Sequence, residues 1–511
     1  MASNQVLLCL PRIINRDYWT YLWDFVGLVQ STGWEVVTLD VSAVQSGELH
    51  PTSRLAWKVN PMARLHRDFL EQLSLGEESP ISPLAKVNLS NDLKFAIANT
   101  STPDDLLRWP FFDGSLGRSV YSLLVTHCIQ GSYPVRATKL RRVIHALAKD
   151  FVVSYLGTQA AIQSRQIAMV AVLNGRAPIQ AGSVQAARES QRAILHLEHG
   201  STPDRYHASP WMTQDRLSLQ SSLGNCTDDL DVEEKKLAES WLRKHREDAS
   251  QNPHTKLFQV RNEPAQGGVT GLAGHVGNAV IFNSSVDEFA GLDPKFWPST
   301  EWESQDVALN SVAAHLSDHG WNVTLRVHPN LCNKPWKEYR RLASTLRSFR
   351  GRIVGPANPL SSYELLKDAH LVVVWGSTIG LEASAHGIPV YVLDNARYDE
   401  CADVRKLPSP QKLEDLQLYE VNPRLGLKFI ARIHLLGRPI VHQMPSHFSQ
   451  MVASAYKRFH RRNLWKRLLF FPLRLFQYPN RSLRVLTTIC GNSLGTQIWE
   501  RIFWKSLIQR D

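Results

Sequence analysis

Residues 321–394 contain the pattern that most restricts how this chain can fold. Four short apolar runs, VTLRV, RIVG, LVVVW and PVYVL, alternate there with segments of helical periodicity. Short runs rich in β-branched residues are typical of parallel strands that are buried on both faces. The stretch therefore predicts half of a doubly wound α/β domain, in which a helix follows each strand.

Polar residues and glycines stand where each predicted strand ends. Open parallel sheets bind their ligands beyond the carboxyl ends of the strands, so we expect these ends to meet in one crevice. The four ends carry His328-Pro329-Asn330, Gly355-Pro356, Gly376-Ser377-Thr378 and Asp394-Asn395.

The sequence GSTIGLE, residues 376–382, predicts a tight turn that leads into a helix. Ser377 and Thr378 place two hydroxyl groups at the expected N-cap. Free backbone N–H groups and the positive end of the helix dipole attract phosphate at such a position. Glu382 follows within two helical turns and could take the ribose hydroxyls of a nucleotide. A nucleotide site is predicted at this turn.

The succession RVHPN and then SSYELLKDAHLVVVWGSTIGLEASAHGIPVYVL resembles the donor-binding domain of GT-B glycosyltransferases that build bacterial capsule and lipopolysaccharide. The most similar groups are capsule transferases with an HP motif and a later Ser-Ser/Thr motif, including the Kdo and sialic acid transferases that use CMP-sugars. Teichoic-acid glycerophosphotransferases look similar in the same stretch. The likeness is good from Ile281 onward and loose in the N-terminal half.

The resemblance implies which residues bind the donor. His328, Ser377 and Thr378 would bind the nucleotide phosphates, and the loop after the strand AVIFNSS would border them. Ser285 could equally be the N-cap of a following helix, and the two roles are compatible. The predicted donor-binding residues are Ser284, Ser285, Arg326, His328, Asn330, Gly376, Ser377, Thr378 and Glu382.

The N-terminal half also reads as an α/β domain. It opens with the apolar run QVLLCLPR, an aromatic helical segment and the run WEVVTLDVS. Two further strands are predicted at IAMVAVLNGR and AILHLEHG. The order of these elements resembles the acceptor-side domain of surface-polysaccharide transferases, which implies that Asn174 and Arg176 face the acceptor. Asn-Gly is also ordinary turn chemistry, so both interpretations stay open. Arg176 and Glu198 would lie at the ends of two strands of one sheet.

An inverting transferase needs a general base near the acceptor hydroxyl. Two carboxylates are candidates for this catalytic role. Asp113 lies in FFDGSLGRS, just before a predicted helix, and Glu198 lies in HLEHG.

The length of 511 residues and the hydrophobic content of 43% fit two or three domains with cores of their own. We predict an acceptor-side domain at 1–263, a donor domain at 279–435, and a crossover helix with a tail at 436–511. Residues 264–278 are rich in glycine but lack the order of a phosphate-binding loop. They are predicted to be a linker between the domains.

Cysteine usage and the N-terminus indicate a cytoplasmic protein. The six cysteines are scattered without metal spacing, which predicts neither a disulfide framework nor a zinc site. The N-terminus lacks the basic segment of a signal peptide, and no apolar run reaches the roughly 18 residues that a membrane-spanning helix needs.

The positive charge is concentrated at the C-terminus. The formal net charge is +11, and residues 457–511 contribute +10 of it. Residues 457–484 hold nine Lys or Arg, no acid, and interleaved Trp, Phe and Leu side chains. This composition is typical of an amphipathic anchor at an anionic membrane surface. Nucleic acid is the alternative partner, but no nucleic-acid motif accompanies the basic residues.

The sequence therefore predicts an α/β enzyme of two Rossmann-like doubly wound domains (GT-B) with a basic amphipathic tail, peripheral on the inner face of the plasma membrane. It would transfer a sugar from a CMP-, CDP- or UDP-linked donor to a lipid-linked or polysaccharide acceptor, without a metal or another cofactor. A UDP-sugar 2-epimerase, a polyol-phosphate transferase and a non-catalytic scaffold of a glycan assembly complex remain alternatives.

Overall fold

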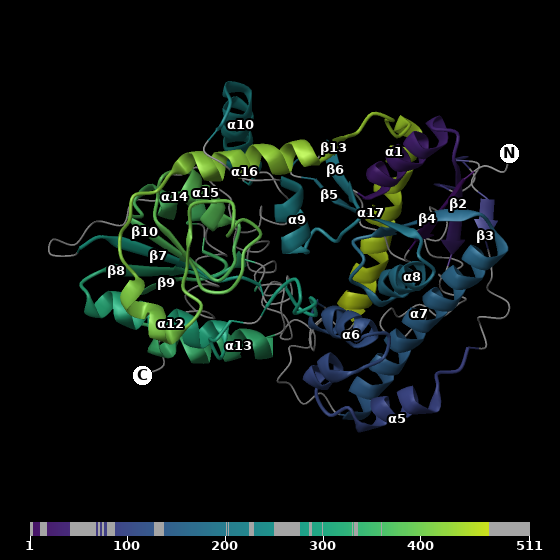
Figure 1. Ribbon diagram of the computed structural model, residues 1–511. Helices are drawn as coiled ribbons and strands as arrows, with labels where there is room; N and C mark the ends of the chain where they lie inside the picture. Colours follow the sequence, from purple (N-terminus) through teal and green to yellow (C-terminus); the bar gives the residue numbers. More distant parts are fainter. Residues whose placement is uncertain are drawn as a thin grey trace. The chain divides into compact units, whose positions relative to one another are not determined.

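The computed structural model describes two compact units, and Figure 1 labels most of their helices and strands. Unit 1 comprises Met1–Asp215, Phe289–Asp293 and His434–Leu469, and unit 2 comprises Arg216–Glu288, Pro294–Ile433 and Phe470–Asp511. Within these ranges the described residues are 4–10, 18–40, 68–69, 72–73, 76–78, 87–126, 137–200, 202, 204–223, 229–249, 276–285, 289–298, 300–329, 331, 336–358 and 360–469.

Unit 1 is built on a sheet with the strand order β13-β6-β5-β4-β1-β2-β3. Strands β1 to β5 are parallel and follow the Rossmann order, because the chain runs from β1 to β3 on one side and then returns to β4 beside β1. Strand β6 is antiparallel to β5, and β13 is antiparallel to β6. The bounds are β1 Gln5–Leu10, β2 Glu35–Asp40, β3 Gly76–Glu78, β4 Ile167–Leu173, β5 Ala193–His199, β6 Arg205–Ser209 and β13 Arg438–Pro439.

Helices cover both faces of this sheet, as the alternation of side chains along β1 requires. Leu8 packs in one core with Trp19 of α1 and Phe448 of α17, whereas Leu7 packs in another with Val153 of α7 and Val184 of α8. The helices of unit 1 are α1 Tyr18–Ser31, α5 Asn91–Asn99, η1 Pro103–Arg108, α6 Ser115–Thr126, α7 Ala137–Ser164, α8 Pro178–Glu189 and α17 Ser446–Leu469.

Unit 2 contains an all-parallel sheet with the order β12-β11-β10-β7-β8-β9. This is again the Rossmann order, with the chain running from β7 to β9 on one side and from β10 to β12 on the other. The order reverses between β7 and β10. The bounds are β7 Asn278–Phe282, β8 Asn322–Arg326, β9 Arg352–Val354, β10 Leu371–Val374, β11 Val390–Val392 and β12 Arg405–Lys406.

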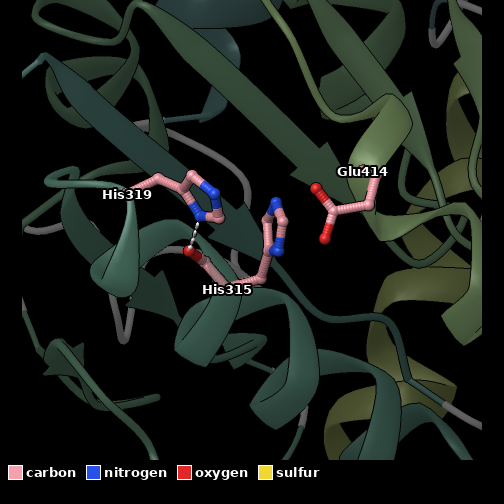
Figure 2. A group of neighbouring side chains, drawn as sticks. All are labelled: His315, His319 and Glu414. Carbon is pink, nitrogen blue, oxygen red and sulfur yellow. Dashed lines mark hydrogen bonds between the residues drawn. The ribbon is translucent and has the colours of Figure 1, made fainter.

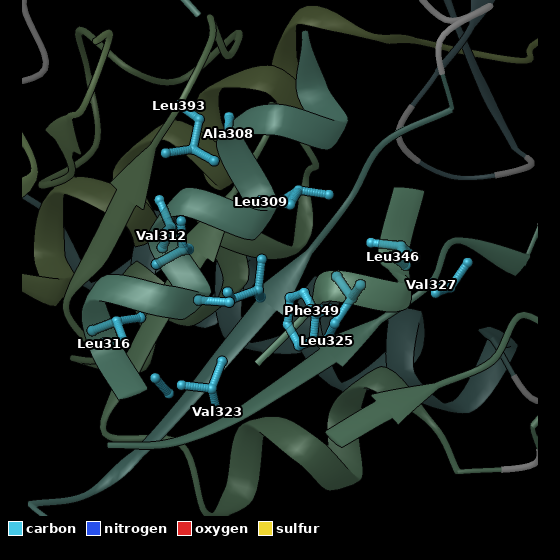
Figure 3. Close-up of a cluster of buried hydrophobic side chains, with 14 of the residues drawn as sticks. Ala308, Leu309, Val312, Leu316, Val323, Leu325, Val327, Leu346, Phe349 and Leu393 are labelled. Atoms are coloured by element: carbon cyan, nitrogen blue, oxygen red, sulfur yellow. The ribbon is translucent and has the colours of Figure 1, made fainter. Parts of the chain in front are cut away.

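The core of unit 2 lies between this sheet and α12, as Figure 3 shows. Leu309, Val312 and Leu316 recur at helical spacing on α12 and pack with Val323 and Leu325 of β8. Burial of each such side chain is worth about 1.5–3 kcal/mol. The helices are α9 Arg216–Leu223, α10 Val232–Ala249, α12 Gln305–Asp318, α13 Trp336–Thr345, η4 Leu346–Ser348, α14 Ser362–Lys367, α15 Ile379–Ala385, η5 Pro410–Asp415 and α16 Pro423–Leu436.

The predicted fold class is confirmed, since both sheets are Rossmann-like. The runs VTLRV, RIVG, LVVVW and PVYVL correspond to β8, β9, β10 and β11, and IAMVAVL and AILHLEH correspond to β4 and β5. The antiparallel strands β6 and β13 were not predicted. Their pairing joins residues more than 200 positions apart, which local periodicity does not reveal.

Several predicted segments fall outside the described residues. These are most of the linker at 264–278, the tail from Phe470 onward and the side chains of 458–469. The division at 1–263, 279–435 and 436–511 stays a prediction. No helix in the described part of the chain is long and apolar enough to cross a membrane.

Candidate functional site

The candidate donor site lies at the carboxyl edge of the sheet of unit 2. The loop 283–285 follows β7 and the loop 375–378 follows β10, and β7 and β10 are the neighbouring strands between which the strand order reverses. Open α/β sheets bind ligands at this switch point because the helices that follow the two strands leave toward opposite faces. The two predicted phosphate loops therefore flank one position.

Hydrogen bonds from the sheet and from α12 fix the loop after β7. Asn283 Oδ1 accepts from the backbone N–H of His328 at 2.6 Å, which joins this loop to the end of β8. Gln305, the first residue of α12, accepts from the Ser284 N–H at 2.7 Å and donates to the Ser284 carbonyl at 3.3 Å. The backbone of the loop is thus held in place before any ligand arrives.

The hydroxyl of Ser284 differs from the rest of this loop. Ser284 is 2% exposed, and its Oγ has no hydrogen-bond partner within the described residues. A buried polar group without a partner costs about 1–3 kcal/mol, so such groups need a reason to persist. Buried hydroxyls of this kind are commonly satisfied by an ordered water or a bound ligand. Ser285 is also buried, at 1% exposed.

The turn after β10 has the predicted shape. Thr378 is the N-cap of α15, and its side chain makes no capping hydrogen bond. The Ser377 carbonyl accepts from the Tyr398 hydroxyl at 2.7 Å. A Cβ at Gly380 would lie 2.3 Å from that hydroxyl, so Tyr398 and the helix can approach this closely only because residue 380 is glycine. Gly376 and Ser377 complete the loop.

Glu382 is more deeply buried than a surface ribose contact would require. The residue is 2% exposed, and Oε1 accepts from the Tyr363 hydroxyl at 3.5 Å. It lies in the first turn of α15, within the predicted two turns. Its role toward a ribose stays a prediction.

The basic residues at the end of β8 differ in their surroundings. Arg326 is 2% exposed, and its guanidinium donates to the carbonyls of Gly355 and Asn358, which follow β9. These hydrogen bonds connect the end of β8 to the loop that follows β9. His328 is half-buried, and Asn330 lies outside the described residues. Binding of the donor by these three residues remains a prediction.

Asp394 follows β11 at the same edge of the sheet, at one of the four strand ends expected in the crevice, but the sequence analysis gave it no role in the site. Its Oδ1 accepts from the side-chain amide of Asn395 at 3.0 Å, and its Oδ2 accepts from the Trp297 indole at 3.4 Å. Burial raises the pKa of this carboxyl to about 6. The perturbed pKa beside the switch point makes Asp394 a candidate functional group. Its position after an apolar strand was the available sequence signal.

A second polar cluster lies at the carboxyl edge of the sheet of unit 1. Asn174 follows β4 and Glu198 lies near the end of the neighbouring strand β5. The Asn174 amide donates to Glu198 Oε2, and the Tyr18 hydroxyl donates to Glu198 Oε1. Burial and the Glu198 carboxylate raise the pKa of the Tyr18 phenol well above its ordinary value, so it stays protonated and a donor. Tyr18 was missed because it is far from Glu198 in sequence.

The turn that carries Asn174 is sterically specified. Asn174 and Gly175 have φ angles of 63° and 95°, in the left-handed region. A Cβ at Gly175 would approach His196 Nδ1 to 2.5 Å, so only glycine fits. The predicted placement of Arg176 and Glu198 at the ends of two strands of one sheet is confirmed.

The other two candidates of unit 1 have different partners. The Arg176 guanidinium donates to Ser122 Oγ and to the Ala290 carbonyl, both at 2.9 Å. These contacts connect segments of unit 1 to one another. Asp113 is exposed and has a φ of 54° in the turn before α6. No hydrogen bond joins Asp113 to Glu198 among the described side chains.

No known family profile and no curated protein sequence matches this chain. Similar solved structures include a Thermosulfurimonas dismutans KpsC, described as a beta Kdo 2,4 transferase, at 15% identity and a TM-score of 0.36, covering 57% of this chain and 88% of that one. A Neisseria meningitidis UDP-GlcNAc 2-epimerase bound to UDP-GlcNAc is similar at 11% identity and a TM-score of 0.28, covering 85% and 98%. Acinetobacter baumannii MurG is similar at 10% identity and a TM-score of 0.28, covering 89% and 99%.

Similarities of this size do not distinguish a transferase from an epimerase. The fold class follows instead from the two sheets themselves. The protein is an α/β protein with two Rossmann-like units, each of which has a polar cluster at the carboxyl edge of its sheet. This architecture is consistent with the GT-B fold.

Proposed function

We propose that this protein is a glycosyltransferase that moves a sugar from a nucleotide-activated donor to a growing cell-surface polysaccharide such as capsule, O-antigen or lipopolysaccharide. The observation that carries the proposal is the pair of loops at the switch point of unit 2. One loop offers the buried Ser284 hydroxyl, and the other offers Ser377 and Thr378 at a helix start. Nucleotides bind Rossmann-like sheets at this place.

In this proposal the donor phosphates contact the hydroxyls of Ser284, Ser377 and Thr378 and the side chain of His328. Backbone N–H groups at the start of α15 add neutral donors, so no metal ion is required to hold the phosphate. Glu382 takes the ribose.

The acceptor binds unit 1, with Glu198 as the general base. Two hydrogen bonds, from Tyr18 and Asn174, already orient this carboxylate. A positioned carboxylate can accept the proton of a sugar hydroxyl as the glycosidic bond forms. Asp113 is the second candidate, with Asn174 and Arg176 as acceptor contacts. The acceptor is lipid-linked or polymeric, and the basic residues 457–484 hold the enzyme on the anionic inner face of the plasma membrane.

Nucleotide binding tests the donor site. The variants are Ser284→Ala, His328→Ala and the pair Ser377→Ala/Thr378→Ala. Calorimetry with CMP, CDP and UDP should show that each variant binds nucleotide about 10- to 150-fold more weakly than the wild type. The reason is that a lost hydrogen bond to a charged phosphate costs about 1.5–3 kcal/mol. Ser348→Ala is the matched control, because that exposed hydroxyl bonds only locally to the Thr345 carbonyl. Unchanged affinity in all three variants, with normal melting, would remove the donor site.

Activity assays test the reaction class. CMP-Kdo, CMP-sialic acid, CDP-glycerol, UDP-GlcNAc and GDP-mannose are each supplied with and without an acceptor glycan. Transfer that falls about 10²- to 10⁴-fold in Glu198→Gln, with unchanged donor affinity, supports the proposed base. Conversion of UDP-GlcNAc alone into its 2-epimer identifies an isomerase instead. Polyol-phosphate transfer from CDP-glycerol identifies the related transferase class.

A further inference from the structure

His315, His319 and Glu414 form a side-chain cluster on unit 2 that the sequence analysis did not predict. His315 lies in the last turn of α12, His319 is its C-cap one turn later, and Glu414 comes from η5, as Figure 2 shows. One ligand atom of each residue, a ring nitrogen of either histidine and a carboxylate oxygen, lies within 4.8 Å of the other two. The sequence analysis judged metal sites by cysteine spacing, and this cluster contains no cysteine.

A hydrogen bond sets the tautomer of one ring. His319 Nδ1 lies 2.8 Å from the His315 carbonyl oxygen, drawn as the dashed line in Figure 2. A carbonyl oxygen only accepts, so Nδ1 carries the hydrogen and, in the neutral ring, Nε2 keeps the lone pair. Metal-binding histidines characteristically use one ring nitrogen in this way while the other binds the ion.

The chemistry of the three groups selects a class of ion. Imidazole nitrogens favour zinc and similar divalent transition metals over calcium and magnesium, which prefer oxygen ligands. With metal–ligand distances of about 2.0–2.2 Å, tetrahedral ligand atoms lie about 3.3–3.6 Å apart. His319 and Glu414 are exposed and His315 is half-buried, so small side-chain rotations can close the remaining gap.

We propose that His315, His319 and Glu414 bind one zinc ion, with water as the fourth ligand, and that the ion fastens η5 to the C-terminal end of α12. The cluster lies at the amino edge of the sheet, because Gly320 and Trp321 follow directly and β8 begins at Asn322. The proposed donor site occupies the carboxyl edge of the same sheet. The zinc site is therefore structural and takes no part in sugar transfer.

The test uses the full-length protein after removal of metals by a chelator. Zinc chloride titrated by calorimetry should bind at one site per chain and should raise the melting temperature by about 5 °C at a 100-fold excess over Kd. His319→Ala and Glu414→Gln should each weaken binding by about 100-fold or more, since even residues that only support a ligand matter about 10- to 100-fold. His447→Ala is the control, because this exposed histidine pairs with Gln72 in unit 1.

Two variants keep the test decisive if one of them misfolds. Cobalt(II) offers a second measurement, since tetrahedral coordination gives strong visible absorption that both variants should abolish. The proposal is overturned if the wild-type protein takes up no more zinc than the His319→Ala/Glu414→Gln double variant, or if His447→Ala lowers binding as much as the single variants do. Nucleotide binding should be unchanged in every variant, which separates this site from the proposed donor site.

Discussion

At the scale of single residues, Asp394 combines a cost to stability with a place beside the candidate donor site. Burial makes ionisation of its carboxyl unfavourable, and the hydrogen bonds from Trp297 and Asn395 only partly offset this. The pKa rises from 3.8 to about 6, so the folded state holds a proton that the unfolded state has already lost between these pH values. Stability therefore falls as pH rises through this window.

Asp394→Asn should reverse this effect. Above pH 6 the variant avoids the buried charge and should gain up to about 3 kcal/mol in free energy of unfolding, from about 1.4 kcal/mol per pKa unit. At about pH 3, below both pKa values, the wild-type carboxyl is largely protonated in both states, and the two proteins should be about equally stable. Urea unfolding at pH 7.5 and at about pH 3 measures the difference. A variant that is no more stable at pH 7.5 would contradict the raised pKa.

At the scale of elements, Asp24 joins α1 to the segment between β13 and α17. Asp24 is 2% exposed. Its Oδ1 accepts hydrogen bonds from the backbone N–H groups of Val441 at 2.7 Å and His442 at 2.5 Å. Its Oδ2 accepts a hydrogen bond from the Tyr206 hydroxyl at 2.8 Å. One buried carboxylate on α1 thus satisfies three donors from two other parts of unit 1, β6 and the segment before α17. It fixes the C-terminal segment where Phe448 and Val452 enter the core.

Asp24→Ala should leave these donors without partners and lower the free energy of unfolding by about 2–4 kcal/mol. Asp24→Asn keeps an acceptor and should cost less. Glu239→Ala is the surface control, since the exposed Lys235–Glu239 pair at 3.9 Å should be worth less than about 0.5 kcal/mol. Thermal melting of the three variants gives the ranking. Equal melting of Asp24→Ala and the control would show that the segment is held by apolar packing alone.

At the scale of the whole molecule, the C-terminal residues serve two purposes in our interpretation. The first turns of α17 pack in unit 1 through Phe448, Val452 and Ala455. Residues 457–484 carry nine basic side chains, and each Lys or Arg near an anionic surface contributes about 1 kcal/mol. The fold of unit 1 therefore needs the first part, and the proposed membrane attachment would depend on the second.

A chain truncated after Tyr456 retains the three packed residues and should stay folded and bind nucleotide. It should no longer sediment with vesicles that contain anionic lipid, whereas the full-length protein should do so at low salt and less at high salt. Neutral vesicles are the control. An insoluble truncated protein would show that the basic segment belongs to the fold. Full-length protein that does not sediment with anionic vesicles would contradict the proposed membrane anchor.

Much of the fold could be predicted because its signals are local. Short β-branched runs mark the buried strands, and the Gly-Ser-Thr sequence marks the start of α15 with Thr378 at its N-cap. The positions of Arg176 and Glu198 at the ends of two strands of one sheet were also predictable, since both follow from where two apolar runs stop. Backbone geometry and side-chain periodicity act over a few residues, so a single sequence displays them.

The candidate site itself depended on contacts between residues far apart in the chain. The reversal between β7 and β10 decides that the loops after these two strands flank one position. Burial decides the raised pKa of Asp394 and the unbonded Ser284 hydroxyl.

The sequence by itself determined the strands that β-branched apolar runs mark, the start of α15 and the residue types at the strand ends, because these follow from local periodicity and capping. Only the tertiary structure decided which ends are neighbours, which polar groups lose water, and that Glu414 lies beside His315 and His319. The physical reason is that strand pairing and desolvation depend on the packing of the whole unit, which brings together side chains that no local pattern connects.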